Sequence, residues 1–110
     1  MYQIKSRIWI EGDKGVFLGE GRIKILKAIE LEGSLSKAAK SLGMSYKKAW
    51  NLVDSINKNA SIPVVITNTG GSGGGGTKIT EYGLKMISAF ENINKNCWDF
   101  LDQQLKELQL

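Results

Sequence analysis

Apolar and polar side chains alternate at the beginning of the chain. Residues 3–11 follow a two-residue period, which predicts a β-strand. The side chains on one face of this strand are Ile4, Ser6, Ile8 and Ile10. Residues 12–15 have the sequence Gly-Asp-Lys-Gly, which is typical of a turn, and residues 16–18 would form a short returning strand.

The next segment has the period of a helix. In residues 21–32, apolar side chains recur at spacings of three and four, which predicts a helix with one apolar stripe. Gly33 follows directly and is a suitable stop, because glycine readily adopts the left-handed conformation that often ends a helix. The first helix is therefore expected to end just before this glycine.

Two further helices follow after short interruptions. Residues 34–42 contain small apolar side chains that allow helices to pack closely, and residues 46–58 have one apolar face at helical spacing. Gly43 lies in the turn between them, where glycine meets a need for positive φ. The serines that could cap these two helices are Ser34, Ser36 and Ser45.

A hairpin is expected after Pro63, which ends the third helix. Residues 64–67 are rich in β-branched side chains, residues 68–76 contain six glycines, and residues 77–80 would form the returning strand. Two closely packed helices followed by a hairpin are typical of a winged helix-turn-helix. The predicted fold class is therefore mainly α with a small β part (α+β), in which the hairpin is the wing.

The last predicted helix is too long for the domain before it to cover. Thr80 can cap a helix over residues 81–110, which would be roughly 45 Å long at about 1.5 Å per residue. Its apolar stripe includes Phe90, Cys97, Trp98, Leu101, Leu105 and Leu108. We interpret residues 1–80 as the winged domain and residues 81–110 as a helix of the same domain that pairs with a second copy of the chain. The alternative is that this segment folds back on its own core as two shorter helices.

The positive charge is concentrated on the two middle helices. The chain carries 15 basic and 11 acidic residues, a net charge of +4, and its pI is near 9.2. Residues 33–58 hold five lysines and one acid, so the whole excess lies there, as a phosphate-binding surface requires. The alternative is an ordinary solvated lysine face.

The composition leaves little room for catalytic or metal chemistry. The chain has one cysteine and no histidine, so an internal disulfide, a histidine-based catalytic centre and a Cys/His zinc site are excluded. No catalytic residues, metal ligands or cofactors are predicted, and no apolar run approaches the ~20 residues of a transmembrane helix. With no secretory signal visible, we expect a cytoplasmic chain that is not an enzyme and has no membrane partner.

The third helix is expected to read DNA. The beginning of a recognition helix typically reaches base edges in the major groove, where lysine contacts guanine or phosphate and asparagine pairs with adenine. Trp50 could pack on a sugar or a thymine methyl group, or else lie at the rim of the core. Hydroxyl groups before the second helix could hold a phosphate. The predicted contacts of these two helices are Ser34, Ser36, Ser45, Tyr46, Lys47, Lys48, Trp50 and Asn51.

The glycine-rich loop is expected to form the tip of the wing, since glycines let the backbone approach a sugar-phosphate chain closely. A nucleotide-binding P-loop is a poor alternative, because Thr77 and Lys78 follow the glycines in inverted order and lead into a strand. A flexible spacer is a second alternative, although a spacer would not sit inside a hairpin. The predicted DNA contacts of the wing are Gly70, Gly71, Ser72, Gly73, Thr77 and Lys78.

Together these segments resemble the DNA-binding domain of the ModE family of molybdate-responsive transcription regulators, and the helix-turn-helix alone resembles the wider LysR-like group. The matching motifs are residues 33–36, Ser45-Tyr46-Lys47-x-Ala49-Trp50, residues 69–76, and Thr80-x-Tyr82-Gly83. The resemblance implies that the third helix and the wing recognise an operator, and that the first and last helices dimerise. It adds Ile25 and Ile29 to the predicted dimer surface.

Three departures from the family pattern bear on function. Family members carry a C-terminal molybdate-binding region, for which we expect no room in a chain that ends at Leu110. An arginine that often enters the wing is replaced by Thr67 or Asn68, and the basic residue of the wing by Ser72. Both replacements remove charge that binds phosphate and are expected to weaken DNA binding.

The sequence therefore predicts a homodimeric, sequence-specific transcription regulator that binds a pseudo-palindromic operator in double-stranded DNA. A separate effector-binding protein could supply a response to a small molecule. The alternative function is a protein-interaction module on a winged-helix scaffold with weak or no DNA binding.

Overall fold

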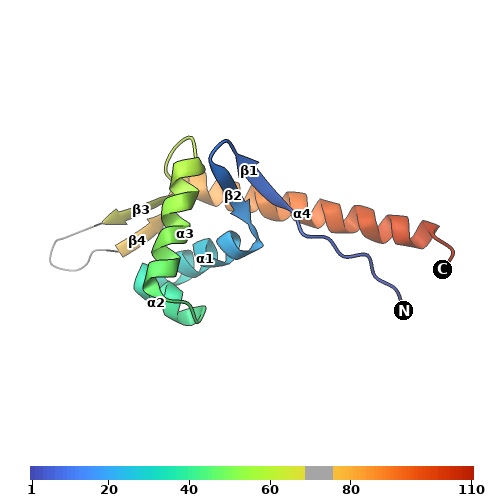
Figure 1. Ribbon diagram of the computed structural model, residues 1–110, viewed down its shortest axis with the longest axis horizontal. Helices are drawn as coiled ribbons and strands as arrows, with labels where there is room; N and C mark the ends of the chain where they lie inside the picture. The colour runs from blue at the N-terminus through green and yellow to red at the C-terminus, as the bar shows by residue number, and fades with distance from the viewer. Residues whose placement is uncertain (69–75) are drawn as a thin grey trace.

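The computed structural model describes residues 1–68 and 76–110, which form three packed helices, two hairpins and a long projecting helix (Figure 1). In chain order the elements are β1 (Trp9–Gly12), β2 (Gly15–Gly19), α1 (Glu20–Glu32), α2 (Leu35–Ser41), α3 (Tyr46–Asn59), β3 (Val65–Asn68), β4 (Gly76–Ile79) and α4 (Glu81–Glu107). This order is that of the predicted α+β winged helix-turn-helix.

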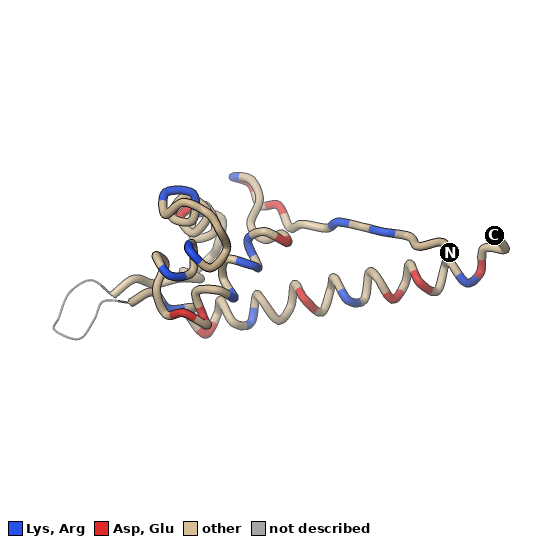
Figure 2. The backbone as a smooth tube through the Cα atoms, turned by 90° about the horizontal axis from the view of Figure 1, so that it is seen from below, with Lys and Arg blue, Asp and Glu red and all other residues tan. Residues whose placement is uncertain are grey.

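The first hairpin is shorter than the sequence pattern suggests. β1 and β2 pair antiparallel. Residues 1–8 are extended but belong to no strand, and they run beside the outer half of α4 (Figure 1 and Figure 2). The predicted strand over residues 3–11 is therefore wrong in its first part. Its alternating face lies against a helix instead of a neighbouring strand, with Ser6 Oγ 3.5 Å from Cys97 Sγ.

The turns between the helices have the predicted geometry. Gly33 ends α1 with a φ of 69°, and Gly43 lies between α2 and α3 with a φ of 66°. Both values are in the left-handed region that favours glycine. Serine hydroxyl groups cap the start of α2 and of α3. The ends of the helices in the helix-turn-helix are thus determined by glycines and serines that act on their neighbours along the chain.

One hydrophobic core joins α1, α2, α3 and the bases of the hairpins. Its largest fully buried side chains are Leu18, Ile25, Leu26, Ile29, Ile56 and Val64. Among the predicted dimer residues, Ile25 and Ile29 are 0% exposed and Phe90 is 4% exposed. The prediction that these three side chains line a dimer surface is wrong, because the chain's own core already covers them.

The wing is fastened to the helices at its base. Asn57 Oδ1 of α3 accepts hydrogen bonds from the N–H groups of Val64 at 2.9 Å and Val65 at 3.1 Å. Its Nδ2 donates to the Val65 carbonyl at 2.9 Å. On the returning strand, the Thr77 N–H donates to the Gly33 carbonyl at 3.1 Å. Hydrogen bonds therefore hold both strands of the wing in position beside α3 and α1.

α4 is one uninterrupted helix of 27 residues. Thr80 caps it as predicted, with its Oγ1 accepting a hydrogen bond from the Gly83 N–H at 3.0 Å. The first turns pack on the core and the remainder projects, so the molecule measures 63 × 28 × 21 Å (Figure 1). The alternative of two shorter helices folded back on the core is therefore wrong.

Candidate nucleic-acid interface

The exposed side of α3 carries polar and basic side chains. Its buried side holds Ala49, Val53 and Ile56. The helical period directs Lys47 and Asn51 away from that side, and both residues are exposed. Ser45 Oγ accepts a hydrogen bond from the Lys48 N–H at 3.1 Å, which stabilises the first turn. The end of α3 that was predicted to read bases is therefore ordered and accessible.

Two aromatic side chains on α3 are open to solvent. Tyr46 is 57% exposed and Trp50 is 50% exposed. An indole ring with half of its surface accessible is free to pack on a sugar or on a thymine methyl group. A half-exposed ring fits both interpretations of Trp50, the nucleic-acid face and the rim of the core, and both stay open.

The serines before and within α2 differ in their roles. Ser34 Oγ accepts a hydrogen bond from the Lys37 N–H at 3.2 Å, whereas Ser36 is exposed on the first turn. A hydroxyl group that accepts one hydrogen bond still has its own proton to donate. Ser34 can therefore cap the helix and bind a phosphate oxygen at the same time, and the same holds for Ser45.

A cleft of about 420 Å³ lies between α1 and α3. This α1–α3 cleft is lined by Arg22, Ser45, Lys47, Lys48, Asn51 and Leu52. It brings together four of the predicted DNA contacts and adds one basic residue that the sequence analysis missed. Arg22 stands at the edge of the apolar stripe of α1, beside the buried Ile23. An edge position in a core helix gives no sign of which neighbouring helix its side chain will meet.

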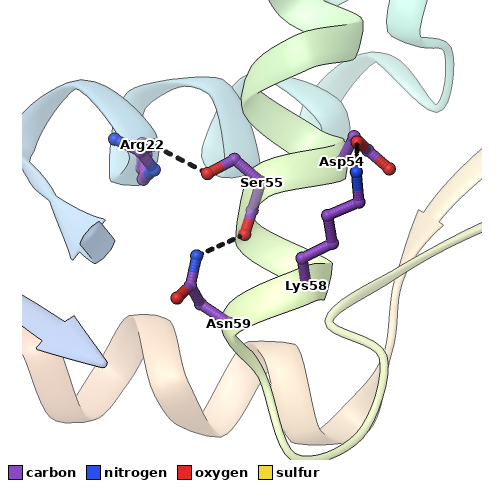
Figure 3. Close-up of polar contacts among 5 residues, drawn as sticks. All are labelled: Arg22, Asp54, Ser55, Lys58 and Asn59. Atoms are coloured by element: carbon purple, nitrogen blue, oxygen red, sulfur yellow. Dashed lines mark hydrogen bonds and ion pairs between the residues drawn. The ribbon is translucent and has the colours of Figure 1, made fainter. Parts of the chain in front are cut away.

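Polar contacts occupy two different sides of α3 (Figure 3). On one side, Arg22 Nη2 donates a hydrogen bond to Ser55 Oγ at 3.0 Å. On the other, Lys58 Nζ lies 2.9 Å from Asp54 Oδ2. The one acid of this helix is thus paired with the lysine at its far end, which leaves the positive charge at the beginning of α3 uncompensated.

The described part of the wing offers fewer contacts than predicted. Gly70, Gly71, Ser72 and Gly73 lie outside the described residues. Thr77, which was predicted to contact DNA, is 5% exposed and its N–H already donates to the Gly33 carbonyl, so neither group is free to do so. Lys78 is exposed, since successive side chains of a strand point to opposite faces.

Elsewhere, the described residues offer neither a metal site nor a membrane-spanning helix. Along α4, basic and acidic residues are interspersed (Figure 2). Within residues 1–68 and 76–110, no group of three or more His, Cys, Asp and Glu side chains could hold a metal ion. None of the described helices has an apolar stretch sufficient to span a bilayer. Cations together with hydroxyl and amide donors around one exposed helix are suited to binding an extended polyanion.

Comparison with curated proteins finds relatives along most of the chain. It is 37% identical over 106 residues to the molybdenum transport protein ModE of Azotobacter vinelandii, covering 94% of this chain and 39% of that protein. It is 38% identical over 89 residues to the DNA-binding transcriptional dual regulator ModE of Escherichia coli K12, covering 78% and 34%. It is 38% identical over 96 residues to the molybdenum-pterin-binding protein MopB of Rhodobacter capsulatus, covering 87% and 36%.

These relatives confirm the resemblance to ModE proteins. None of the three carries the name of an enzyme, in agreement with the sequence prediction. The chain spans between 34% and 39% of the length of these relatives. No protein-family model matches the chain.

A solved structure supports the fold. ArgP from Mycobacterium tuberculosis is similar to this chain with a TM-score of 0.51 and 15% sequence identity, covering 80% of this chain and 30% of that one. At this identity the likeness concerns the fold alone. It agrees with the predicted winged helix-turn-helix.

Proposed function

We propose that the chain is a sequence-specific, DNA-binding transcription regulator. The observation that supports this best is the exposed beginning of α3, where Lys47 and Asn51 stand beside the basic α1–α3 cleft. Lysine and asparagine both have the donors that read purine edges in the major groove. The one acid of the helix, Asp54, is paired with Lys58 and so does not neutralise this end. The relative from E. coli, whose name describes a DNA-binding regulator, supports the same function.

We further propose that two copies act together on a pseudo-palindromic operator. The outer half of α4 exposes Ile93 by 50% and Phe100 by 61%. These two side chains are seven residues apart, which is the repeat of helices that pair side by side. The predicted dimer residues near them are Cys97, Trp98, Leu101, Leu105 and Leu108. A two-fold dimer would set the half-sites one helical turn apart, roughly 34–36 Å, or a multiple of that distance.

We expect the protein to act in the cytoplasm, with double-stranded DNA and a second copy of itself as partners. A separate effector-binding protein is a third candidate partner.

Fluorescence anisotropy at several salt concentrations tests the proposal. A labelled duplex from the protein's own promoter region is compared with a scrambled duplex of the same length and composition. We expect tighter binding to the promoter duplex, with an affinity that falls steeply as salt rises, because bound lysine and arginine release counterions from DNA. Equal, weak binding to both duplexes would contradict the proposal and favour the protein-interaction module.

A further inference from the structure

We infer that Arg22 binds a DNA phosphate at the edge of the α1–α3 cleft, on the side of the recognition helix opposite the wing. This inference deepens the proposed function and rests on it. The cleft gathers Arg22 with Lys47 and Lys48. In the part of the chain that the structure describes, none of these three cations takes part in an ion pair. Like charges around one cleft repel each other, and an anion bound between them would be attracted to all three cations.

The guanidinium group of Arg22 is held in position but has donors to spare. Nη2 donates to Ser55 Oγ at 3.0 Å, which anchors the side chain on α3 (Figure 3). The side chain is half-buried, and Nε is buried with no hydrogen-bond partner among the described residues. Burying part of a charged group that lacks partners is costly. A guanidinium group has five donors in a planar fork that matches phosphate oxygens, and Ser55 takes only one of them, so the remaining Nη donors are left to bind a phosphate at the cleft.

The position of α3 between Arg22 and the wing explains why a phosphate would lie there. Ser55 contacts Arg22, whereas Asn57 contacts the backbone of Val65 in the wing. Two residues correspond to about 200° around a helix, so these contacts leave opposite sides of α3. The major groove is roughly 12 Å wide and has a sugar-phosphate chain along each edge. With α3 in the groove, the wing would face one chain and Arg22 the other.

The salt dependence of DNA binding tests this assignment. The promoter and scrambled duplexes are titrated with wild-type protein and with Arg22→Gln, Arg22→Lys and Ser55→Ala. Lys95→Gln, on the outer half of α4, is the control for loss of one charge. For Arg22→Gln we expect the slope of log affinity against log salt to shrink by about 0.9 for each protomer bound. The affinity should fall roughly fivefold per protomer at about 0.15 M salt, equally on both duplexes, because a phosphate contact carries no sequence information.

The other variants separate a phosphate contact from a purely structural role. Arg22→Lys should keep the salt slope and lose part of the affinity, because its single ammonium group retains the charge but not the fork. Ser55→Ala and Lys95→Gln should leave the slope unchanged. If Arg22→Gln lowers thermal stability but leaves the slope at the wild-type value, Arg22 is structural and the inference is overturned while the proposed function stands. Wild-type protein that binds neither duplex would overturn both.

Discussion

Lys47 is the single side chain on α3 whose removal should affect DNA recognition most directly. It is exposed on the first turn and lines the α1–α3 cleft. Lys47→Ala removes its donor without touching the core, so we expect operator binding to weaken by about 1–3 kcal/mol if the contact is to a base. Anisotropy on promoter and scrambled duplexes measures the loss, with Lys106→Ala at the far end of α4 as the control. An unchanged affinity would remove Lys47 from the interface.

Asn57 is the residue on which the position of the wing depends. Its side-chain oxygen accepts hydrogen bonds from the N–H groups of Val64 and Val65. These two valines are 0% and 3% exposed, so their N–H groups have little access to water. Asn57→Ala leaves both donors buried and unpaired, and we expect a loss of about 1–3 kcal/mol in the free energy of unfolding. Urea denaturation measures this loss. Asn51→Ala, on the exposed side of the same helix, is the matched control and should change DNA affinity but not stability.

At the scale of elements, Gly83 determines how closely α4 approaches the wing. A Cβ at this position would lie 2.6 Å from the Val64 carbonyl oxygen and 2.7 Å from Ile79 Cγ2. Helix propensity alone predicts that Gly83→Ala stabilises α4 by roughly 1 kcal/mol. The close contacts predict the opposite, a destabilisation of about 1–3 kcal/mol from overpacking. Thermal or urea unfolding decides between the two.

Gly21 provides the matched control, because it also lies near the start of a helix. A Cβ there would meet nothing within 4 Å. Gly21→Ala should therefore raise stability, by up to about 1 kcal/mol. If both glycine substitutions stabilise the protein, the close packing of α4 on the base of the wing is not a constraint on the fold.

The elements whose signals are local could be predicted from the sequence. Gly33 and Gly43 adopt the expected left-handed conformation, and Ser34, Ser45 and Thr80 cap the expected helices. In each case the cause lies within three or four residues along the chain. The exposed face of α3 follows in the same way from the helical period, and this is why four of the residues that line the α1–α3 cleft could be named as one surface from the sequence.

What the sequence could not provide was the identity of neighbours distant along the chain. The alternation of residues 3–8 is real, but its partner is α4, 91 residues beyond Ser6 in the contact with Cys97. The resemblance assigned Ile25 and Ile29 to a dimer surface, but the apolar stripe that holds them is covered by the chain's own core, and a stripe alone does not reveal which partner covers it. Likewise, the roles of Arg22 and Gly83 depend on contacts with other elements, which the sequence around these residues does not reveal.

The whole molecule separates its charge along its length. Residues 33–58 carry five lysines and one acid, whereas α4 carries three lysines and five acids. Lys5 and Arg7, in the segment that runs beside the outer half of α4 (Figure 2), offset the acids there, so DNA attracts the first region more strongly than the second. The projecting helix is therefore suited to contacts with protein at the end of the molecule away from DNA, and its exposed apolar side chains favour a second copy as the partner.

Substitution of Phe100 tests whether α4 pairs with a second copy. Because Phe100 is 61% exposed, Phe100→Asp should leave the protomer folded while placing a charge in the helix–helix contact. We expect light scattering to show a dimer for wild-type protein and a monomer for this variant, and the same for Leu101→Asp. Ser88→Asp adds an equal charge at an exposed position of the same helix, about 120° around the axis from Phe100 and about 140° from Leu101, and should stay dimeric. The loss of the dimer should also lower operator affinity, since two half-sites are then no longer bound together. A dimer that survives both substitutions on the apolar side would show that α4 does not form the interface, and a monomeric wild-type protein would remove the two-fold operator from the proposal.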